Sequence, residues 1–379
     1  MFARTCVLLL ALSVTACSAA RFGPLDSVLS LTQTSVFNSL PSWISSAFEV
    51  PKQANGVVQF EAWKKEHGKT YGSEDEHKEK FQVYQANVRM IDEHNKVHKD
   101  VTLVVNKFAD FTNEEFKNIY TPKTFDLSRK RKPEFRHESV EVDVAKDGLK
   151  DWRTSGAVTR VKDQGQCGSC WSFSTTGSTE GIHAIKTGKL LQFSEQELVD
   201  CDTSQDHGCN GGLMDYAFNF IVANGGLDTE WDYPYTGAQQ TCKVAKEKRD
   251  MGSITGFEDV PSGDEQAMLK AVSQQPVSVA IEADQFAFQF YSTGVINTPL
   301  CGTNLDHGVL VVGYGTDNAT GTDVDYWIVK NSWGAEWGEE GYLRIARHSS
   351  PLDAKGPGTC GIALSASYPV IDDKLFIAL

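Results

Sequence analysis

The chain has 379 residues, enough for more than one folding unit, and its 40% hydrophobic and 10% aromatic residues exclude a disordered protein. Residues 1–145 carry 19 basic and 19 acidic side chains, so the formal net charge of −14 lies entirely in residues 146–379. This acidic C-terminal part argues against electrostatic binding of nucleic acid, which requires a basic surface.

The N-terminus has the pattern of a secretory signal. Arg4 precedes an apolar run at residues 6–12, and small residues follow. The run is too short to cross a bilayer, which needs about 20 apolar residues. We therefore expect residues 1–20 to be a cleaved leader and the mature protein to be soluble, in a lysosome-like vacuole or outside the cell. The sequence VTAC ending at Cys17 also resembles a bacterial lipoprotein processing site, which is the alternative.

The next part of the chain is predicted to be helical. Residues 21–55 are rich in Ser and Thr and receive no assignment. Between residue 56 and about residue 120, hydrophobic side chains recur at helical spacing. The clearest series is Phe81, Tyr84, Val88 and Ile91. The basic residues 129–132 precede Pro133, a pattern typical of an exposed linker that is open to proteolysis.

The chain changes character after about Asp143. Short mixed segments with Gly turns run to about Gly256, and strand-like runs follow. These runs cover residues 277–281, 309–312, 326–329 and 342–345. Helical and turn-rich material followed by strands predicts an α+β unit with two subdomains.

The cysteine count indicates an oxidising compartment. Without Cys6 and Cys17 of the leader, seven cysteines remain, an odd number that predicts three disulfides and one free thiol. They are Cys167, Cys170, Cys201, Cys209, Cys242, Cys301 and Cys360. Spacing alone selects no pairing.

The pair Cys167 and Cys170 allows four interpretations. A redox Cys-x-x-Cys requires a thioredoxin-like context that the sequence lacks, and Cys201, His207 and Cys209 form a poor second half for a zinc site. Two structural cysteines would leave the odd count unexplained. The fourth interpretation is a nucleophile, which requires a lowered thiol pKa and a histidine partner.

The residues around Cys170 favour a helix start but not a helix. Ser169 could cap a helix that begins at Cys170. The following residues 171–177 (WSFSTTG) have poor helix propensity, so this helix would depend on burial.

Three segments resemble the papain family of cysteine proteases. Residues 164–171 (QGQCGSCW) are similar to the family's active-site segment. The signature expects His and Asn far downstream, and here His307 lies in LDHG and Asn331 in NSWG. Chance agreement of all three in this order is very improbable, although each alone has an ordinary structural explanation. The resemblance extends from Trp152 to about Val370.

The resemblance implies a papain-like fold with a helical left and a β-barrel-like right subdomain. The sequence GCNGGLMD at residues 208–215 is most similar to the cathepsin L-like branch. The implied disulfides are Cys167–Cys209, Cys201–Cys242 and Cys301–Cys360, which leaves Cys170 free.

The helical region resembles the inhibitory propeptide of this family. Glu76, Lys80, Tyr84, Asn87, Ile91 and Asn95 lie on one helical face, like the ERFNIN stripe, with Lys and Tyr where the name has Arg and Phe. Asn106, Phe108 and Asp110 resemble the second propeptide motif, with Val104 where Gly is usual. We therefore expect an inhibitory propeptide at residues 56–145 and a mature protease at residues 146–379.

The mechanism that the resemblance implies is thiol proteolysis. Cys170 attacks the scissile carbonyl as a thiolate, His307 protonates the leaving amine, and Asn331 orients the imidazole. Gln164 and the Cys170 N–H bind the oxyanion, and Trp333 shields the Asn331–His307 bond.

The family's substrate-binding residues also have counterparts here. Gly211 and Gly212 would present backbone to an extended peptide, and the S2 pocket would accept a hydrophobic P2 side chain. That pocket would be formed by Leu213, Met214, Ala280 and Leu305, with Ser365 at its floor, and we count Asp306 and Trp333 among the substrate-binding residues. We expect an endopeptidase with protein substrates and its own propeptide as inhibitor. No cofactor, metal, nucleic acid or membrane span is implied, and the protein is expected to be a monomer.

Two other classes of function are alternatives. A catalytically silent binding protein on the same fold is disfavoured because Cys170, His307, Asn331 and Gln164 are all present. A thiol oxidoreductase would show two accessible thiols where the protease shows one. Separately, Asn318 begins an Asn-x-Thr sequon in a turn-rich stretch and is a candidate glycosylation site.

Overall fold

The structure, a computed structural model, describes residues 52–121, 135–143, 148–243, 251–297, 300–318, 321–348 and 354–372. The chain divides into two compact units, one ending at Lys69 and the other beginning at Thr70. The expected leader and the basic linker lie outside the described residues. No helix within the described ranges is long and apolar enough to cross a membrane.

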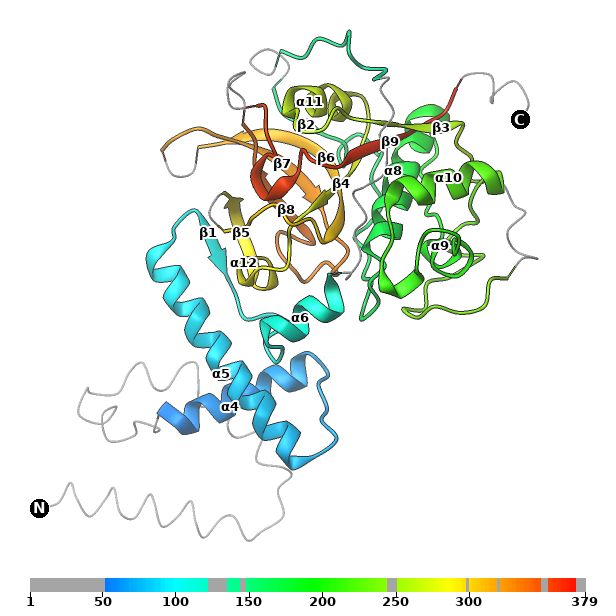
Figure 1. Ribbon diagram of the computed structural model, residues 1–379. Coiled ribbons are helices and arrows are strands. Elements are labelled where there is room, and N and C mark those ends of the chain that lie inside the picture. The colour runs from blue at the N-terminus through cyan, green and yellow to red at the C-terminus, as the bar shows by residue number, and fades with distance from the viewer. Residues whose placement is uncertain are drawn as a thin grey trace, which may run out of the picture. The chain divides into compact units, whose positions relative to one another are not determined.

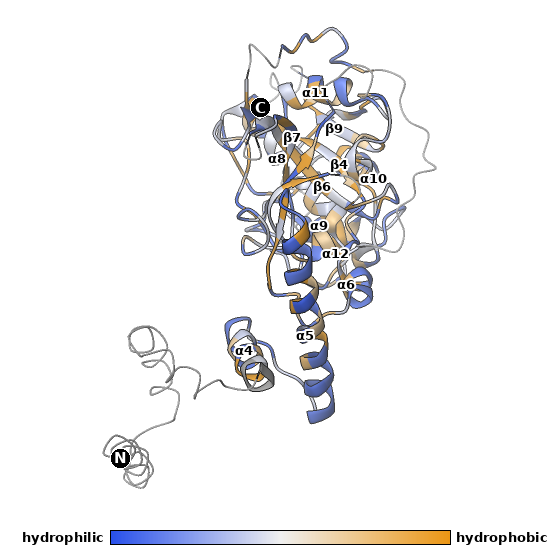
Figure 2. Cartoon of the chain, turned by 90° about the vertical axis from the view of Figure 1, so that its left-hand side faces the viewer, coloured by the Kyte–Doolittle hydropathy of each residue, from blue (hydrophilic) through white to orange (hydrophobic). Residues whose placement is uncertain are grey.

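The expected propeptide region is helical, as its hydrophobic periodicity predicts. Its elements are α4 (Lys52–Glu66) in the first unit, and α5 (Glu74–Val97), β1 (Val101–Leu103) and α6 (Asn113–Tyr120) in the second. Ser73 caps α5 by accepting a hydrogen bond from the Glu76 N–H, and the Glu76 carboxylate accepts one from Gly72. Hydrophilic and hydrophobic residues alternate along the turns of α5 (Figure 2). The helix buries Tyr84, Asn87 and Ile91 of the predicted stripe.

Three helices group on one side of the second unit (Figure 1). They are α8 (Cys170–Thr187), α9 (Glu195–Cys201) and α10 (Met214–Asn224), with a short 3₁₀ turn η4 (Gly208–Asn210) between the last two. The sequence of α8 has low helix propensity, yet most of its side chains are buried. Tertiary packing therefore stabilises this helix, as expected from its composition.

The other side of the second unit is a nine-stranded sheet. Its remaining strands are β2 (Lys150–Asp151), β3 (Gly256–Asp259), β4 (Val277–Ile281), β5 (Tyr291–Ile296), β6 (His307–Asp317), β7 (Val324–Lys330), β8 (Tyr342–Ala346) and β9 (Ala366–Val370). The strand order is β1-β5-β8-β7-β6-β4-β9-β3, and β2 pairs with β6. All four predicted strands are present, and β6, β7 and β8 extend beyond their predicted limits.

Three short helical elements connect these strands. They are α11 (Glu265–Gln274), α12 (Phe286–Gln289) and the 3₁₀ turn η5 (Thr359–Gly361). Asp264 caps α11 by accepting hydrogen bonds from the N–H groups of Gln266 and Ala267.

Close packing joins α8 to the sheet. A Cβ atom at Gly177 would lie 2.8 Å from Leu310 Cδ2, and one at Gly181 would lie 2.7 Å from Pro276 Cγ. Glycine at both positions lets α8 approach β6 and β4 closely. The middle of α8 is thereby packed against Leu310 of β6 and against Pro276, which precedes β4.

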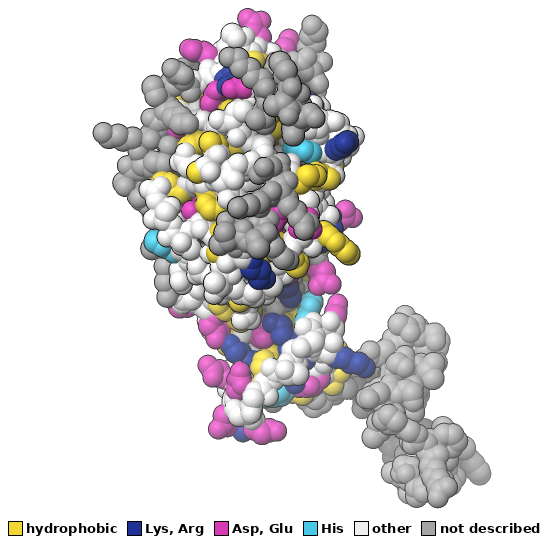
Figure 3. Space-filling model, turned by 90° about the vertical axis from the view of Figure 1, so that its right-hand side faces the viewer, with side chains coloured by type: hydrophobic (Ala, Val, Ile, Leu, Met, Phe, Trp, Pro, Cys, Tyr) yellow, Lys and Arg dark blue, Asp and Glu magenta, His cyan; other side chains and the backbone are white. Residues whose placement is uncertain are grey.

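On the face drawn in Figure 3, hydrophobic side chains lie in small groups among polar ones. Trp231 is the most exposed large hydrophobic residue in the described part of the chain, at 92%.

Candidate active site

Cys170 lies at the N-terminus of α8 and is the free cysteine among the described residues. Its side chain is fully buried, and Sγ accepts a hydrogen bond from the Gly308 N–H at 3.3 Å. The disulfide between Cys167 and Cys209 fixes the preceding loop, and the Gly168 N–H donates to the Cys209 carbonyl at 3.0 Å. The thiol is therefore held at one position beside the first residues of β6.

Ser169 precedes the helix but does not cap it, so this part of the sequence-based expectation was wrong. Its hydroxyl makes no hydrogen bond to the N–H groups of α8 and instead lies 2.7 Å from the Tyr235 hydroxyl. The Tyr235 hydroxyl donates in turn to the Gln164 carbonyl at 2.8 Å. Because a tertiary partner competes for the hydroxyl, Ser169 connects the Cys170 loop to the rest of the helical side.

His307 and Asn331 are brought together by antiparallel pairing of β6 with β7. His307 is the first residue of β6, Asn331 follows the last residue of β7, and His307 Nε2 lies 2.7 Å from Asn331 Oδ1. The Trp333 ring covers the imidazole with centroids 4.7 Å apart. The described arrangement therefore holds the imidazole ring in one orientation.

Burial keeps the thiol and the imidazole neutral. It raises the pKa of Cys170 to about 12, and it lowers the pKa of His307 to about 4 against the opposing effect of the hydrogen bond to Asn331. Within the described residues, His307 Nδ1 has no hydrogen-bond partner. In this form of the protein, burial therefore disfavours the charged forms of both groups.

Gln164 is fully buried and oriented by hydrogen bonds at both ends of its amide. Nε2 donates to the Cys167 carbonyl at 3.0 Å, and Oε1 accepts from the Ser332 hydroxyl at 2.7 Å. An amide nitrogen has two N–H donors, so the second remains for another acceptor.

The expected S2 residues come from both sides of the second unit. Leu213 and Met214 precede or begin α10, whereas Ala280 in β4 pairs with Gly308 of β6. Met214, Ala280 and Leu305 belong to one buried apolar cluster. The Ala280 N–H donates to the Ser365 carbonyl at 2.9 Å, so Ser365 lies beside this strand.

Asp306 precedes His307 and is mostly buried. Its Oδ1 accepts a hydrogen bond from the Ala283 N–H at 2.8 Å. Burial raises the pKa of Asp306 to about 8 despite this hydrogen bond, and the charges of Asp284 and Glu282 act in the same direction. Burial thus favours the neutral form of the carboxyl group that precedes His307 in the sequence.

Aromatic residues of the expected propeptide pack on Trp333. The rings of Phe108, Phe116 and Tyr120 lie 6.0, 5.2 and 6.1 Å from the Trp333 ring, all in edge-to-face geometry. Sequence analysis placed Phe108 in a motif but missed this cluster. The signal available was the aromatic spacing in α6, which shows an apolar face but not its partner.

Strand pairing and charge add to this contact. β1 pairs with β5 in antiparallel register, and Val104 extends the pairing by donating to the Phe290 carbonyl at 2.9 Å. Lys107 contacts Asp163 at 2.5 Å, and Lys117 contacts Asp284 at 2.9 Å. The expected propeptide is therefore held by backbone, aromatic and ionic contacts.

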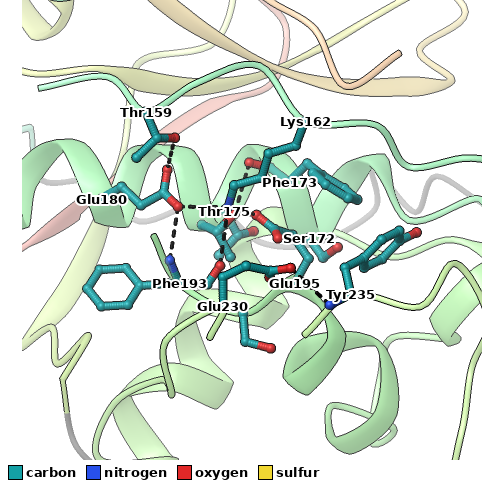
Figure 4. Close-up of polar contacts among 12 residues, drawn as sticks. Thr159, Lys162, Ser172, Phe173, Thr175, Glu180, Phe193, Glu195, Glu230 and Tyr235 are labelled. Atoms are coloured by element: carbon teal, nitrogen blue, oxygen red, sulfur yellow. Dashed lines mark hydrogen bonds and ion pairs between the residues drawn. The ribbon is translucent and has the colours of Figure 1, made fainter. Parts of the chain in front are cut away.

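A buried ionic cluster joins three charged residues of the second unit, and no motif in the sequence indicates it. Lys162 Nζ contacts Glu180 Oε1 at 2.9 Å and Glu195 Oε1 at 2.5 Å (Figure 4). Thr159 also donates to Glu180, at 2.6 Å, and receives a hydrogen bond from Lys330 at 3.0 Å. Because Lys330 precedes Asn331, this cluster connects the helical side with the end of β7. Because these charged residues are far apart in the sequence, no local pattern indicates that they meet in the fold.

The remaining expected residues are also located. The three disulfides join Cys167 to Cys209, Cys201 to Cys242 and Cys301 to Cys360, the pairs that the resemblance implies. Asn318 is exposed at the end of β6, where its amide contacts the Asp323 carboxylate.

Comparison with known proteins assigns the class. Residues 148–370 match the papain family cysteine protease model, and residues 60–116 match the cathepsin propeptide inhibitor domain (I29). The chain is 48% identical to "Cysteine proteinase RD21A" of Arabidopsis thaliana, across 84% of this chain and 67% of that protein. It is 51% identical to "Vignain" of Ricinus communis, across 82% and 85%. The match therefore spans about two-thirds of the length of the first of these relatives.

Solved structures of precursor forms give the same result. The proform of the ragweed pollen allergen Amb a 11 cysteine protease has a TM-score of 0.73 and 41% identity, covering 84% of this chain and 95% of that one. Recombinant stem bromelain precursor has a TM-score of 0.74 and 40% identity, covering 84% and 100%. The chain belongs to the papain family of cysteine proteases and carries an inhibitory propeptide domain, so it is a zymogen.

Proposed function

We propose that this zymogen yields an endopeptidase in which Cys170 is the nucleophile. The observation that carries the proposal is the arrangement of three side chains. The buried Cys170 thiol contacts Gly308, and the adjacent His307 is held by Asn331 at 2.7 Å. A thiol next to an oriented imidazole is the arrangement that nucleophilic catalysis requires.

The reaction follows from these positions. Transfer of the thiol proton to His307 gives a thiolate, which attacks the carbonyl carbon of the scissile bond. His307 then protonates the departing amine, and a water molecule hydrolyses the thioester that remains on Cys170. The Gln164 amide and the Cys170 N–H stabilise the oxyanion, which carries full charge only near the transition state.

Formation of the ion pair is coupled to removal of the propeptide. In the zymogen both groups are neutral, because burial disfavours the thiolate and the imidazolium. Once water and substrate can reach the site, the two charges stabilise each other and the proton transfer becomes favourable.

The nucleophile is tested with Cys170→Ser, a substitution of almost the same volume. The variant, cleaved in trans, is expected to lose peptide hydrolysis because a serine hydroxyl has no comparable ionised fraction. Ser155→Ala, which changes an exposed residue, is the control. Appreciable turnover by Cys170→Ser would refute the assignment, and release of only terminal residues from long peptides would indicate an exopeptidase.

The S2 pocket is proposed to select hydrophobic P2 residues. Its expected residues are apolar apart from Ser365, and Met214, Ala280 and Leu305 already share a buried cluster. Peptides with Leu or Phe at P2 are expected to be cleaved faster than peptides with Arg. Ser365→Glu is expected to reverse part of this preference by placing a carboxylate at the floor, whereas Ser155→Glu is not. An unchanged preference in Ser365→Glu would contradict this pocket.

The remaining proposals concern cellular location and glycosylation. Residues 1–20 are proposed to direct the zymogen to the secretory pathway, for use in a vacuole or outside the cell. Asn318 is proposed to carry a glycan because its side chain is exposed. Mass spectrometry of native material, compared with Asn318→Gln, tests this modification.

A further inference from the structure

A loop between α9 and α10 carries the proposed substrate-binding glycines and is attached to the Cys170 helix. Trp171 Nε1 donates to the Gly208 carbonyl at 3.1 Å. The loop is also closed on itself, since the His207 N–H donates to the Gly211 carbonyl at 2.9 Å. The position of Gly211 and Gly212 relative to the thiol therefore depends on what supports this loop.

Asp206 is that support. Its side chain is 1% exposed, and its Oδ1 accepts a hydrogen bond from the Leu213 N–H at 2.8 Å. A Cβ atom at Gly212 would lie 2.6 Å from the same oxygen and 2.7 Å from Trp171 Cδ2. The Gly212 backbone is therefore packed between the Asp206 carboxyl group and the Trp171 ring.

A second buried carboxyl group acts on Asp206. Asp202 is 2% exposed, and besides burial its charge and its hydrogen-bonding capacity raise the pKa of the Asp206 carboxyl group. Within the described residues, Oδ2 of each side chain has no N–H or hydroxyl partner. Two carboxyl groups can share a hydrogen bond only if one proton lies between them.

The surroundings favour retention of this proton. Burial and the charge of Asp202 raise the pKa of Asp206, and Asp215 in the first turn of α10 adds negative charge. The adjacent His207 is exposed, and α8 contributes the uncharged Trp171 ring. The second ionisation of the pair therefore requires a pH well above the ordinary range of aspartate, about 4.

We propose that Asp202 and Asp206 share one proton and thereby position Gly211, Gly212 and Leu213 to bind the peptide substrate. When the pair loses this proton, two buried carboxylates repel each other and the loop leaves its binding position. The inference rests on the proposed function, because it assigns these glycines to substrate binding.

The raised pKa of Asp206 determines whether substrate affinity rises or falls with pH. A carboxyl group whose pKa is raised by folding stabilises the folded arrangement at acidic pH and ceases to do so as pH rises through the raised value. Substrate affinity is therefore expected to be highest at acidic pH and to fall at alkaline pH. This effect acts on binding, whereas ionisation of the Cys170–His307 pair acts on the chemical step.

The test measures the affinity of a peptide with Leu at P2 for Cys170→Ser protein that has been cleaved in trans, between pH 5 and pH 9. The inactive background removes the titration of the nucleophile. Kd is expected to rise at least about tenfold across this range, and to stay nearly constant when Asp206→Asn is added. The asparagine amide can donate to Asp202 and accept from Leu213 without a shared proton. Glu336→Gln removes one exposed negative charge and is the matched control.

Two outcomes would overturn the inference: an equal rise of Kd in the Asp206→Asn background, or a rise abolished equally by Glu336→Gln. Hydrogen exchange at the Leu213 amide, corrected for the intrinsic pH effect, gives a second measurement that needs no activity. Protection is expected to fall at pH 9 unless Asp206→Asn is present. If the mature enzyme with Cys170 intact cleaves no peptide at any pH, the proposed function itself is refuted.

Discussion

At the scale of single residues, local motifs suggested which side chains to propose as functional, but not the protonation state of those side chains. Cys170, His307 and Asn331 each lie in a short recognisable segment. Nothing in those segments indicates that burial raises the pKa of the thiol and lowers the pKa of the imidazole in the zymogen. Protonation depends on what surrounds a group in three dimensions, so it could not be predicted from the sequence.

Loss of the Gln164 side chain is expected to slow the chemical step. Because its amide is fixed at both ends and retains one N–H, Gln164→Ala is expected to lower kcat by about 10²–10³-fold, with little change in KM. Ser332→Ala removes only one orienting hydrogen bond and is expected to cost about tenfold or less. Steady-state kinetics of the mature forms measures both effects, and a change confined to KM would mean that Gln164 only positions substrate.

The carboxyl pair shows what motif analysis omits. Asp202 and Asp206 are acidic residues in a polar loop, where the ordinary expectation is solvent exposure. Both are instead buried, and Asp206 packs against Gly212. Only the tertiary structure shows this burial.

At the scale of elements, strands and helices differed in how well sequence predicted them. The four strands were found from β-branched and aromatic runs. Helix α8 was expected only through resemblance, since its Ser, Thr and Gly residues disfavour a helix in isolation. Those same small residues allow α8 to approach Leu310 and Pro276. Packing of α8 against the sheet therefore outweighs the low helix propensity of its sequence.

The aromatic side chains of helix α6 are expected to contribute to inhibition by the propeptide. Phe116 is fully buried, and its ring lies 5.2 Å from Trp333. Loss of a buried Phe costs about 3 kcal/mol or more, so Phe116→Ala is expected to weaken inhibition by the propeptide roughly a hundredfold. The inhibition constant of residues 56–145 against the mature enzyme measures this change.

Met90→Ala is the matched control, because Met90 is 47% exposed on α5. Circular dichroism of both variants separates loss of contact from loss of helix. Equal inhibition by Phe116→Ala and the unaltered segment would show that the aromatic cluster does not contribute to binding.

At the scale of the whole molecule, the division of charge has a structural counterpart. The neutral N-terminal part meets an acidic protease domain, and the ion pairs Lys107–Asp163 and Lys117–Asp284 join them. Arg136 adds contacts to Glu258 at 2.8 Å and Asp372 at 3.0 Å. The division of charge is visible in the sequence, but the partners of each ion pair are not, because they come from distant strands and loops.

Acid is expected to weaken the zymogen. Burial alone would raise the pKa of Glu115, but hydrogen bonds from Lys80 and Thr112 outweigh it and lower the pKa. Lys80, Thr112 and Glu115 all lie in the expected propeptide, so this contact stabilises the fold of the inhibitory segment itself. The stabilisation is present above the ordinary carboxyl pKa and is lost as pH falls through the depressed value. His307 acts in the same direction, since its pKa is lowered and the buried neutral form loses stability below about pH 6.5.

Inhibition by residues 56–145 is accordingly predicted to be tight at pH 7 and weaker at pH 4.5. Inhibition constants at the two pH values, with mature enzyme activity measured separately at each, provide the test. If inhibition is equal or tighter at pH 4.5, acid does not loosen the complex and activation requires another protease.

The pairing of β1 with β5 has a consequence for the enzyme after maturation. In the zymogen, β5 lies between β1 and β8, so backbone groups on both of its sides are paired. Departure of the propeptide turns β5 into an edge strand, and its N–H and C=O groups become available to any extended chain. The segment proposed to inhibit the enzyme thus also covers this edge of the sheet. Its premature loss is expected to permit self-association through strand addition as well as uncontrolled proteolysis.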